Sequence, residues 1–296
     1  MHDKRNRTLD FLPAAIVRPI DDDNDPRIRE IAALKERAER DRTGQFQIEG
    51  LRFLIQATEQ NFPIDSLVYA RSELKLPLAI QTARRLIDAG VPALEVTPRV
   101  LRELAYREDP QGVIAVTRQR WQPLAMATPS AGLCWLAVDS IQSAGNLGTL
   151  LRTLDCVGGA GLILVGDTVD PYDPGCVRAT MGAIFNQRMV RATFEELQNW
   201  AHRHRAAIVG TSPTAKDDYH SACYRRPTIL FIGSERKGLS NDTQSRCDMV
   251  VRIPMVGRSD SLNLSVAASI VLYEVFQQHS AARPLSRQVR NFKNQF

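Results

Sequence analysis

The first half of the chain alternates short apolar strands with amphipathic helices. The strands share alternating or continuous apolar residues ended by a glycine or a polar turn, and they are predicted at 44–50, 66–70, 93–96 and 112–116. The helices share apolar positions three or four residues apart, and they are predicted at 27–42, 51–61, 82–89 and 98–105. Residues 1–26 are polar and fit neither pattern, so they are interpreted as a flexible extension. This order predicts a compact α/β domain over residues 27–118.

The second half shows a different pattern, in which strands are continuously apolar. Residues 119–132, with Pro123 and Pro129, are interpreted as a linker. The strands that follow are predicted at 134–138, 161–165, 188–190, 206–210, 228–232 and 249–253, and the last helix at 264–279. Continuous apolar strands separated by helices are typical of a parallel sheet covered on both faces. We therefore expect a second α/β domain over residues 133–279, followed by a frayed basic tail over 280–296.

Composition narrows the classes of function. The 296 residues leave room for two domains, and a net charge of +5 suits a polyanionic partner, although many other proteins share such a charge. No apolar run is long enough for a bilayer, and the amino terminus lacks the apolar core of a signal peptide, so a cytoplasmic protein without a membrane partner is expected. Five cysteines without C-x-x-C spacing argue against a disulfide framework and against a metal site.

The first segment with chemical potential follows the strand at 134–138. Gly145 and Gly148 permit a tight turn and a close approach of a ligand or another backbone. Asn146 stands where a helix would begin and could cap it. Arg152, one to two turns further, could bind phosphate with forked, charge-assisted bonds. Taken alone, the segment favours a simple strand-to-helix turn with a surface arginine.

Two further segments lie nearer the carboxyl terminus. Gly233-Ser-Glu-Arg-Lys-Gly238 follows an apolar strand, which is where open α/β sheets bind ligands, but it matches neither a Walker A loop nor G-x-G-x-x-G. Ile253-Pro-Met255 is followed by Ser261-Leu-Asn263, and Ser261 or Asn263 could cap the last helix. Each segment alone could be an ordinary charged turn or helix cap.

Together, in this order, the three segments resemble the SpoU (TrmH-like) family of SPOUT RNA 2′-O-ribose methyltransferases. The resemblance covers 133–279 and rests on Asn146, Gly148 and Arg152, then on Gly233, Ser234, Glu235 and Gly238, then on Ile253–Met255 and Ser261–Ala267. Residues 27–118 resemble the ribosomal-protein-like RNA-binding domain of many members, through Phe46–Gly50 and Pro110–Val116. Three motifs in the right order are far more specific than one short pattern.

The resemblance implies a fold, a cofactor and an assembly. It implies a deep trefoil knot from about Phe231 to Leu272, and a homodimer with each active site near the interface. It also implies S-adenosylmethionine, held by backbone groups at Gly233, Ile253 and Leu262, with Thr211 as a further candidate. The apolar face of the last helix is either internal core or dimer surface, and it comprises Leu264, Ala268, Val271, Leu272 and Val275.

The resemblance also implies roles in catalysis. Arg152 would be the central catalytic residue, clamping phosphate and stabilising the developing alkoxide, although a role as base is open. Asn146 would orient Arg152 or the ribose, Glu235 would position the loop and the arginine, and Ser261 and Asn263 would close the site. In the RNA-binding domain the candidates for phosphate contacts are Arg99, Arg102, Arg107, Arg118 and Arg120.

Ribosomal RNA is the preferred substrate because of the extra amino-terminal domain, and transfer RNA is the main alternative. Three other classes compete with this interpretation. A non-catalytic RNA-binding protein of the same fold would not need Arg152, Glu235 and Asn263. An enzyme that methylates a base belongs to SPOUT branches whose motifs differ from Ser261-Leu-Asn263. A Rossmann-type nucleotide-binding protein would carry the glycine fingerprint that is missing here.

Overall fold

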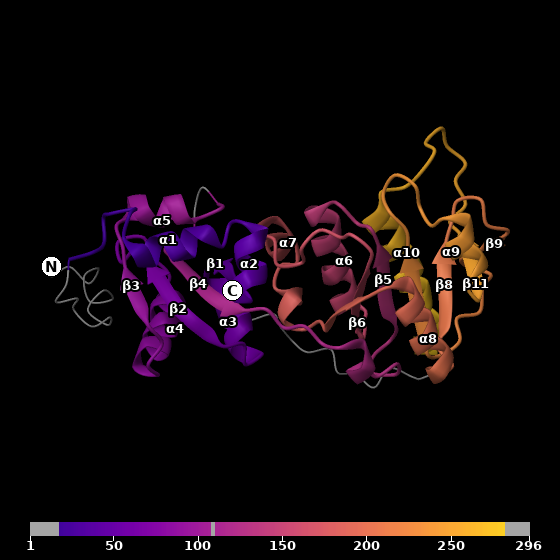
Figure 1. Ribbon diagram of the computed structural model, residues 1–296, viewed down its shortest axis with the longest axis horizontal. Coiled ribbons are helices and arrows are strands. Elements are labelled where there is room, and N and C mark those ends of the chain that lie inside the picture. Colours follow the sequence, from indigo (N-terminus) through magenta and orange to yellow (C-terminus); the bar gives the residue numbers. More distant parts are fainter. Residues whose placement is uncertain (1–17, 108–109, 282–296) are drawn as a thin grey trace, which may run out of the picture. The chain divides into compact units, whose positions relative to one another are not determined.

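The computed structural model describes residues 18–107 and 110–281 (Figure 1). Most of the predicted amino-terminal extension and of the predicted basic tail lies outside these residues. The chain divides into two compact units. Of the described residues, the first unit comprises 18–107, 110–121, 143–152 and 169–187, and the second comprises 122–142, 153–168 and 188–281.

The first unit contains a four-stranded mixed sheet with the order β1-β4-β2-β3. Its strands are β1 (Gln45–Glu49), β2 (Ile64–Tyr69), β3 (Ala93–Glu95) and β4 (Val113–Arg118). The central strand β4 pairs antiparallel with β1 and β2, while β2 and β3 are parallel. All four strands were predicted, because each carries apolar residues followed by a turn; β1, β2 and β4 bury theirs, whereas the three residues of the short β3 are only half-buried.

Helices cover this small sheet (Figure 1). They are α1 (Pro26–Ala33), α2 (Arg37–Thr43), α3 (Leu51–Glu59), α4 (Pro77–Asp88) and α5 (Pro98–Leu104), with α7 (Pro174–Ala179) and the 3₁₀ helix η2 (Ala183–Phe185) from the second half of the chain. Ile28 and Ile31 of α1 and Val100 and Leu101 of α5 form one core with the sheet residue Val68. Removing such side chains from water is the main favourable contribution to the folding of this unit.

Two predicted helices differ from the structure. The helix predicted at 27–42 is two helices, α1 and α2, separated by residues 34–36. The guanidinium of Arg40 donates to the carbonyls of Leu34 at 3.0 Å and Lys35 at 2.8 Å, so a tertiary network satisfies the backbone groups at the break. Helix α4 begins at Pro77, five residues before the predicted start, because a proline fits the first turn of a helix.

The second unit contains a seven-stranded sheet with the order β7-β6-β5-β10-β8-β11-β9, and every pair of neighbours is parallel. Its strands are β5 (Trp135–Asp139), β6 (Gly161–Val165), β7 (Met189–Ala192), β8 (Ala207–Thr211), β9 (Asp217–Asp218), β10 (Thr228–Ile232) and β11 (Met249–Arg252). The six predicted strands are present. The seventh, β9, has only two residues, too few for any periodicity to predict.

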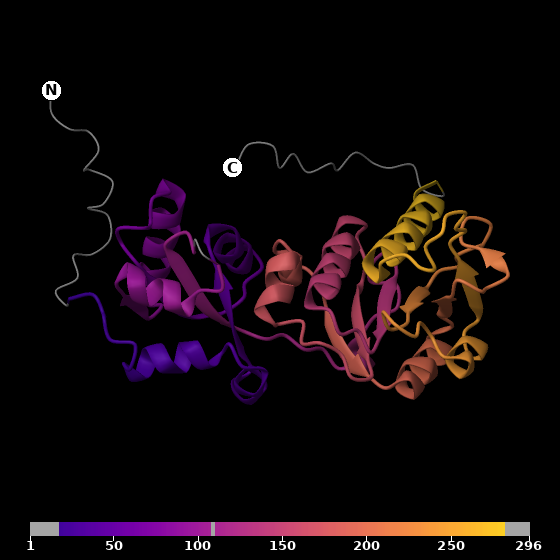
Figure 2. The same ribbon diagram turned by 90° about the horizontal axis from the view of Figure 1, so that it is seen from above.

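Helices flank this sheet on both faces, as the apolar strands predicted (Figures 1 and 2). They are α8 (Phe194–His204), α9 (Asn241–Ser245) and α10 (Leu264–Ala281), with the 3₁₀ helix η1 (Leu124–Met126). Helix α6 (Ala144–Cys156) begins in the segment that groups with the first unit. Helices α8 and α10 lie on opposite faces of the sheet (Figure 2). Leu197 and Trp200 of α8 pack into one core with Trp135 and Phe231 of the strands.

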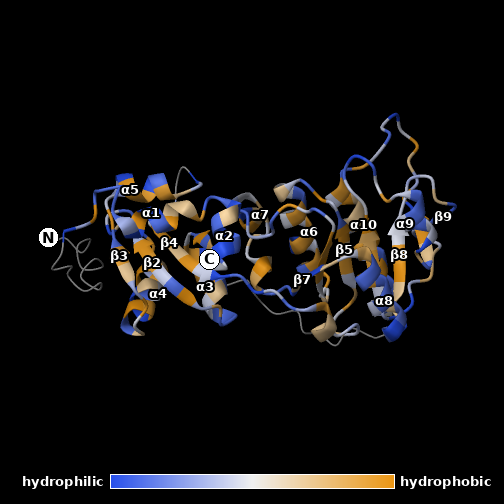
Figure 3. Cartoon of the chain, viewed as in Figure 1, coloured by the Kyte–Doolittle hydropathy of each residue, from blue (hydrophilic) through white to orange (hydrophobic). Residues whose placement is uncertain are grey.

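The fold class is therefore α/β, with a large parallel sheet and a smaller α/β region, as predicted. Figure 3 shows the apolar residues concentrated in the strands and the polar residues in the connecting loops. The order of the large sheet is not the order of the chain, since β10 lies between β5 and β8, which both precede it. No helix among the described residues has the length and hydropathy that a bilayer crossing requires.

Candidate functional site

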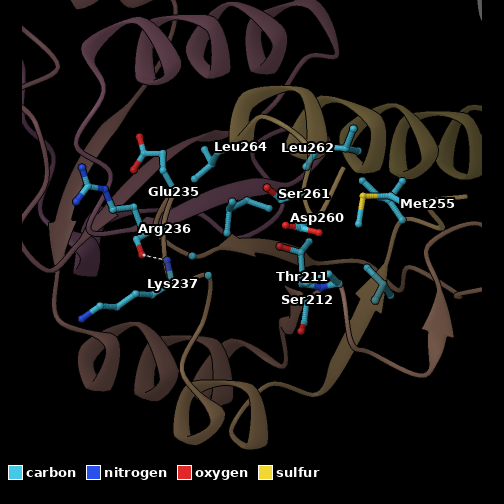
Figure 4. Close-up of a pocket in the computed structure, with 18 residues that line it drawn as sticks. Thr211, Ser212, Glu235, Arg236, Lys237, Met255, Asp260, Ser261, Leu262 and Leu264 are labelled. Atoms are coloured by element: carbon cyan, nitrogen blue, oxygen red, sulfur yellow. Dashed lines mark hydrogen bonds between the residues drawn. The ribbon is translucent and has the colours of Figure 1, made fainter. Parts of the chain in front are cut away.

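A cavity of about 370 Å³ opens in the second unit, among the loops that follow β8, β10 and β11 and the start of α10 (Figure 4). This volume falls within the range of small-molecule sites, roughly 300–1,000 Å³. The loops leave the carboxyl ends of parallel strands, which is where open α/β sheets bind ligands. The lining residues are Thr211, Ser212, Pro213, Ile232, Gly233, Ser234, Glu235, Arg236, Lys237, Gly238, Val251, Ile253, Met255, Asp260, Ser261, Leu262, Leu264 and Ala267.

The four residues predicted to bind a cofactor all line this cavity. Thr211 is the last residue of β8, and Gly233 directly follows β10. Ile253 directly follows β11, and Leu262 stands two residues before α10. The structure therefore brings together four positions that span more than fifty residues of sequence.

The loop after β10 is a tight turn, and this accounts for its glycines. The backbone N–H of Gly238 donates to the carbonyl of Ser234 at 3.0 Å, and that of Lys237 donates to Ser234 Oγ at 3.3 Å. Gly238 has a φ of +61°, a value that costs glycine little. A Cβ on Gly233 would lie 2.1 Å from the carbonyl carbon of Gly238. The turn thus closes on itself, and its remaining residues form one wall of the cavity.

Glu235 and Ser261, both predicted as catalytic, also line the cavity. The Glu235 carboxylate accepts a hydrogen bond from the backbone N–H of Gln142 at 3.2 Å, so it is tied to the loop after β5. Figure 4 shows Glu235, Arg236 and Lys237 on one side, with Thr211, Ser212, Asp260 and Ser261 grouped beside them. The cavity therefore combines carboxylates, hydroxyls and cationic side chains with apolar residues.

Asn263 caps α10. Its Oδ1 accepts from the backbone N–H of Ser265 at 2.9 Å, from the Ser265 hydroxyl at 2.6 Å and from the backbone N–H of Val266 at 3.3 Å. Of the two residues predicted as possible caps, Asn263 fills that role. Because Leu264 and Ala267 at the start of α10 line the cavity, this cap fixes part of its wall.

Asn146 and Arg152 lie on α6, in the segment that groups with the first unit. The backbone N–H of Asn146 donates to Ser143 Oγ at 3.2 Å, so Ser143 rather than Asn146 supplies a side-chain cap here. Arg152 is exposed. Within residues 18–107 and 110–281, no hydrogen bond or ion pair holds its guanidinium. That group is therefore available to an anionic ligand.

Three of the five arginines predicted to bind RNA phosphates form ion pairs on the surface of the first unit. Arg99 Nη1 lies 2.6 Å from Asp23, and the hydrogen bonds and negative charges of Asp23 and Asp21 raise the pKa of its guanidinium. Arg102 lies 2.7 Å from Glu73, and Arg118 lies 3.0 Å from Asp65. Surface pairs of this kind are weak, so they can exchange for phosphate.

The other two arginines have different surroundings. Arg120 donates to the carbonyls of Gln60 and Asn61 at the end of α3, and its guanidinium carbon lies 3.8 Å from the centre of the Phe62 ring. Arg107 is exposed, and its backbone N–H donates to Glu49 at 3.3 Å. Burial raises the pKa of the Glu49 carboxyl, although two backbone hydrogen bonds oppose that rise. Arg120 thus has a structural task, whereas the Arg107 side chain remains exposed.

Sequence reasoning missed two features. Ser212, Arg236, Lys237 and Asp260 line the cavity but were not predicted as site residues; their signal was their position inside or beside the motifs. Arg40 was also missed. It is buried and donates to Asp170 at 2.7 Å, across 130 residues of sequence, and no local pattern indicates such a pair.

Comparisons with known proteins agree with this geometry. The family described as SpoU rRNA Methylase matches residues 134–273, and the MRM3-like substrate binding domain matches residues 25–115. A 23S rRNA (uridine(2479)-2′-O)-methyltransferase of Streptomyces viridochromogenes is 33% identical over 261 residues, covering 85% of this chain and 89% of that protein.

Solved structures show the same similarity. The AdoMet-bound rRNA methyltransferase of Sinorhizobium meliloti is 34% identical with a TM-score of 0.81, covering 88% of this chain and 97% of that one. The SpoU methyltransferase AviRb of Streptomyces viridochromogenes in complex with AdoMet is 32% identical with a TM-score of 0.78, covering 86% and 98%. The chain therefore belongs to the SpoU (TrmH-like) family of SPOUT RNA methyltransferases.

Proposed function

We propose that this protein transfers a methyl group from S-adenosylmethionine to a ribose 2′-hydroxyl of ribosomal RNA. The observation that carries the proposal is the cavity at the carboxyl ends of β8, β10 and β11, because it gathers all four predicted cofactor residues with Glu235 and Ser261. The rRNA substrate of the 33% identical relative and the cofactor in two solved relatives support the same assignment.

The cavity residues fit this cofactor chemically. The apolar side chains of Ile232, Val251 and Leu264 suit an adenine ring. The hydroxyls of Thr211 and Ser212, together with backbone groups at Gly233, suit the ribose and the base edge. Carboxylates and cationic side chains are both present, so the ammonium and carboxylate of an amino acid can each meet an opposite charge. The residues predicted to hold the cofactor are Thr211, Gly233, Ile253 and Leu262.

When bound, the cofactor supplies a methyl group already activated on a positively charged sulfur. The chain must hold the ribose hydroxyl in line with that methyl group and accept the charge that develops on the oxygen. Arg152 is proposed for this task, since its guanidinium is exposed and has no partner among the described residues. An arginine seldom releases its proton, so clamping phosphate and stabilising an alkoxide suit it better than acting as a base.

The remaining residues keep supporting roles. In the complex with RNA, Glu235 would position the loop after β10 and the guanidinium, Asn146 would orient Arg152 or the ribose, and Ser261 would donate from the cavity wall. Asn263 holds the start of α10. Residues 27–118 are proposed to bind RNA, with phosphate contacts from arginines such as Arg107, and residues 133–279 to transfer the methyl group, with 119–132 joining them. The proposal also includes the trefoil knot typical of SPOUT proteins, at about residues 231–272.

We also propose a homodimer that acts in the cytoplasm. The face of α10 that could have been core or dimer surface is buried within the single chain, from Leu264 to Val275. A different apolar group is exposed beside the cavity: Met255, Val256, Leu262 and Val266. Exposed apolar patches of this kind mark association surfaces, which supports a second copy of the chain near the site.

The decisive experiment combines cofactor binding with methyl transfer. Calorimetry of the full chain with S-adenosylmethionine should show binding, and tritium from the labelled methyl group should enter ribosomal RNA taken from cells without this gene. Mass-spectrometric mapping should then find one new ribose methylation. Transfer only to tRNA would favour the alternative substrate, and methylation of a base would contradict the ribose assignment. A protein that binds RNA but neither binds the cofactor nor transfers a methyl group would be a non-catalytic member of the fold.

A further inference from the structure

Three neighbouring strands of the large sheet end on the same edge, and one residue connects the loops that follow them. The strands are β6, β5 and β10, which lie side by side in that order and end at Val165, Asp139 and Ile232. The connecting residue is Gln142, in the loop after β5. It was not among the predicted site residues, and it does not line the cavity.

Gln142 donates hydrogen bonds to residues of three loops. Its backbone N–H donates to Glu235 Oε2 at 3.2 Å, in the loop after β10. Its side-chain Nε2 donates to the carbonyl of Asp167 at 2.8 Å, in the loop after β6, and to the carbonyl of Ser140 in its own loop at 3.4 Å. One side chain and one backbone group therefore join three loops that are distant in sequence.

The loops after β5 and β6 are closely packed against each other, so a shift of one loop also moves the other. Ser140 has a φ of +52°, which is unusual for a residue with a side chain, and its N–H donates to the carbonyl of Val165 at 3.0 Å. A Cβ on Gly166 would lie 2.8 Å from Ser140 Oγ and 2.9 Å from Asp139 Oδ1. Beyond this closely packed point, Gln142 is the next connection between the loops.

We propose that Gln142 is a positioning residue that holds the Glu235 carboxylate in its catalytic orientation, by fixing the loop after β5 against the loops after β6 and β10. This inference rests on the proposed function. The Gln142 side chain is exposed, so its hydrogen bonds compete with water and add little to the stability of the fold. Its effect falls on geometry, because small displacements of a catalytic group reduce the rate strongly.

Because Gln142 contacts Glu235 through its backbone N–H, a substitution of its side chain leaves that hydrogen bond in place. Every residue except proline keeps the backbone donor to Glu235, so replacing the side chain removes only the connection to Asp167 and Ser140. Gln142→Glu has nearly the same shape but cannot donate when ionised, and it places a negative charge near Glu235. Gln142→Lys has a different shape but restores a donor for the Asp167 carbonyl. The two variants therefore separate the hydrogen bond from the bulk of the side chain.

The test measures the rate of methyl transfer to ribosomal RNA taken from cells without this gene. RNA is supplied at saturating and at limiting concentrations, so that kcat and the KM for RNA are obtained separately. For Gln142→Glu we expect kcat to fall about tenfold, with the Kd for S-adenosylmethionine and the KM for RNA within about twofold of the parent values. Gln142→Lys should recover most of the lost kcat. The matched control is Gln198→Glu, on α8 of the same unit, where the new charge would pair with Arg246 and activity should not change.

A second measurement does not depend on activity. Hydrogen exchange of the protein without cofactor should show faster exchange over residues 233–238 in Gln142→Glu than in the parent and in Gln142→Lys. The proposal would be overturned if Gln142→Glu kept the kcat of the parent, or if Gln142→Glu and Gln142→Lys lost kcat equally. It would also be overturned if hydrogen exchange over residues 233–238 were the same in Gln142→Glu as in the parent. If Gln142→Glu fails to fold, Gln142→Ala carries the same comparison. If the parent chain transfers no methyl group, the proposed function fails, and the exchange experiment still decides whether Gln142 holds the loop.

Discussion

The region around the small sheet and the cavity beside the large sheet both contain many charged groups, but they use them differently. Around the small sheet, charges meet protein partners. Arg40 is buried against Asp170, and the surface arginines Arg99, Arg102 and Arg118 each face a carboxylate. At the cavity, Arg236, Lys237 and Asp260 are exposed, and no ion pair holds them within the part of the chain that the structure describes.

The physical reason is the cost of removing a charge from water. A buried guanidinium loses its hydration and must recover the loss from several well-placed acceptors, which Arg40 finds in Asp170 and in two backbone carbonyls. An exposed charge keeps its water and can exchange it for a ligand. Buried, satisfied charges therefore indicate structure, whereas exposed charges can bind a ligand, whether they are grouped around a cavity or held only in weak surface pairs. The following predictions test that distinction.

The largest effect is expected at the buried pair. Arg40→Ala should lower the free energy of unfolding by about 3–5 kcal/mol, because it leaves Asp170 buried without its cation. Urea unfolding followed by circular dichroism measures this change. Arg37→Ala is the control, since its 3.5 Å pair with Asp41 is on the surface and should contribute less than about 1 kcal/mol. Equal losses in the two variants would remove the distinction between buried and exposed charges.

The next effect concerns Arg152, an exposed charge with no described partner. Arg152→Ala should reduce kcat by about 10²–10³, which is typical when a group that stabilises a developing charge is removed. Binding of S-adenosylmethionine, measured by calorimetry, should stay largely intact, as should the free energy of unfolding. Near-normal turnover in the tritiated-methyl assay would defeat the assignment of this residue.

A smaller effect is expected for the surface pairs of the first unit. RNA affinity should fall as salt is raised, because binding releases counterions from the phosphates. Arg102→Ala and Arg118→Ala should each lower the slope of log affinity against log salt by about 1 if their side chains leave Glu73 and Asp65 for phosphate. Filter binding at several salt concentrations measures the slopes. A salt-independent affinity would show that these arginines remain with their protein partners.

The smallest effect is a dependence of stability on pH. His279 is buried on α10, its Nε2 donates to the carbonyl of Tyr224 at 2.8 Å, and desolvation lowers its pKa below 6.5. The unfolded chain then takes up a proton that the folded chain refuses, so stability falls as the pH drops below 6.5 toward the folded pKa. Thermal unfolding between pH 7 and 5 measures this fall. His279→Gln keeps a donor for the Tyr224 carbonyl and should remove the fall in stability between pH 7 and 5. If the variant shows the same dependence on pH as the parent, other groups cause the fall.

Much of the fold followed from local pattern, and the exceptions have tertiary causes. The strands were predicted because each carries a short apolar run before a turn, and this signal does not depend on distant residues. The break between α1 and α2 depends on Arg40, whose partner Asp170 is 130 residues away. No periodicity within 27–42 contains that information.

The candidate site divides in the same way. Its backbone positions were predicted from motifs, because one local turn requires glycine at Gly233, where a Cβ has no room, and at Gly238, where φ is positive. The partners of its side chains could not be predicted in this way. The predicted cap of α6 was Asn146, whereas the structure gives that role to Ser143. For α10 the sequence left Ser261 and Asn263 open, and the structure assigns the cap to Asn263. The acidic partners of Arg102 and Arg118 come from other elements, so sequence alone could not separate paired arginines from available ones.

The place of β10 between two earlier strands has a consequence for biosynthesis. Since β5 and β8 leave the ribosome first, they cannot pair with each other in the final arrangement and must keep a gap for a strand that is not yet made. A nascent chain that ends before β10 (Thr228–Ile232) therefore lacks the central strand of the sheet, and it lacks the cavity. Because the lining of the cavity also includes the loop after β11 and the start of α10, a stalled nascent chain should gain the capacity to hold a ligand only after α10 has emerged.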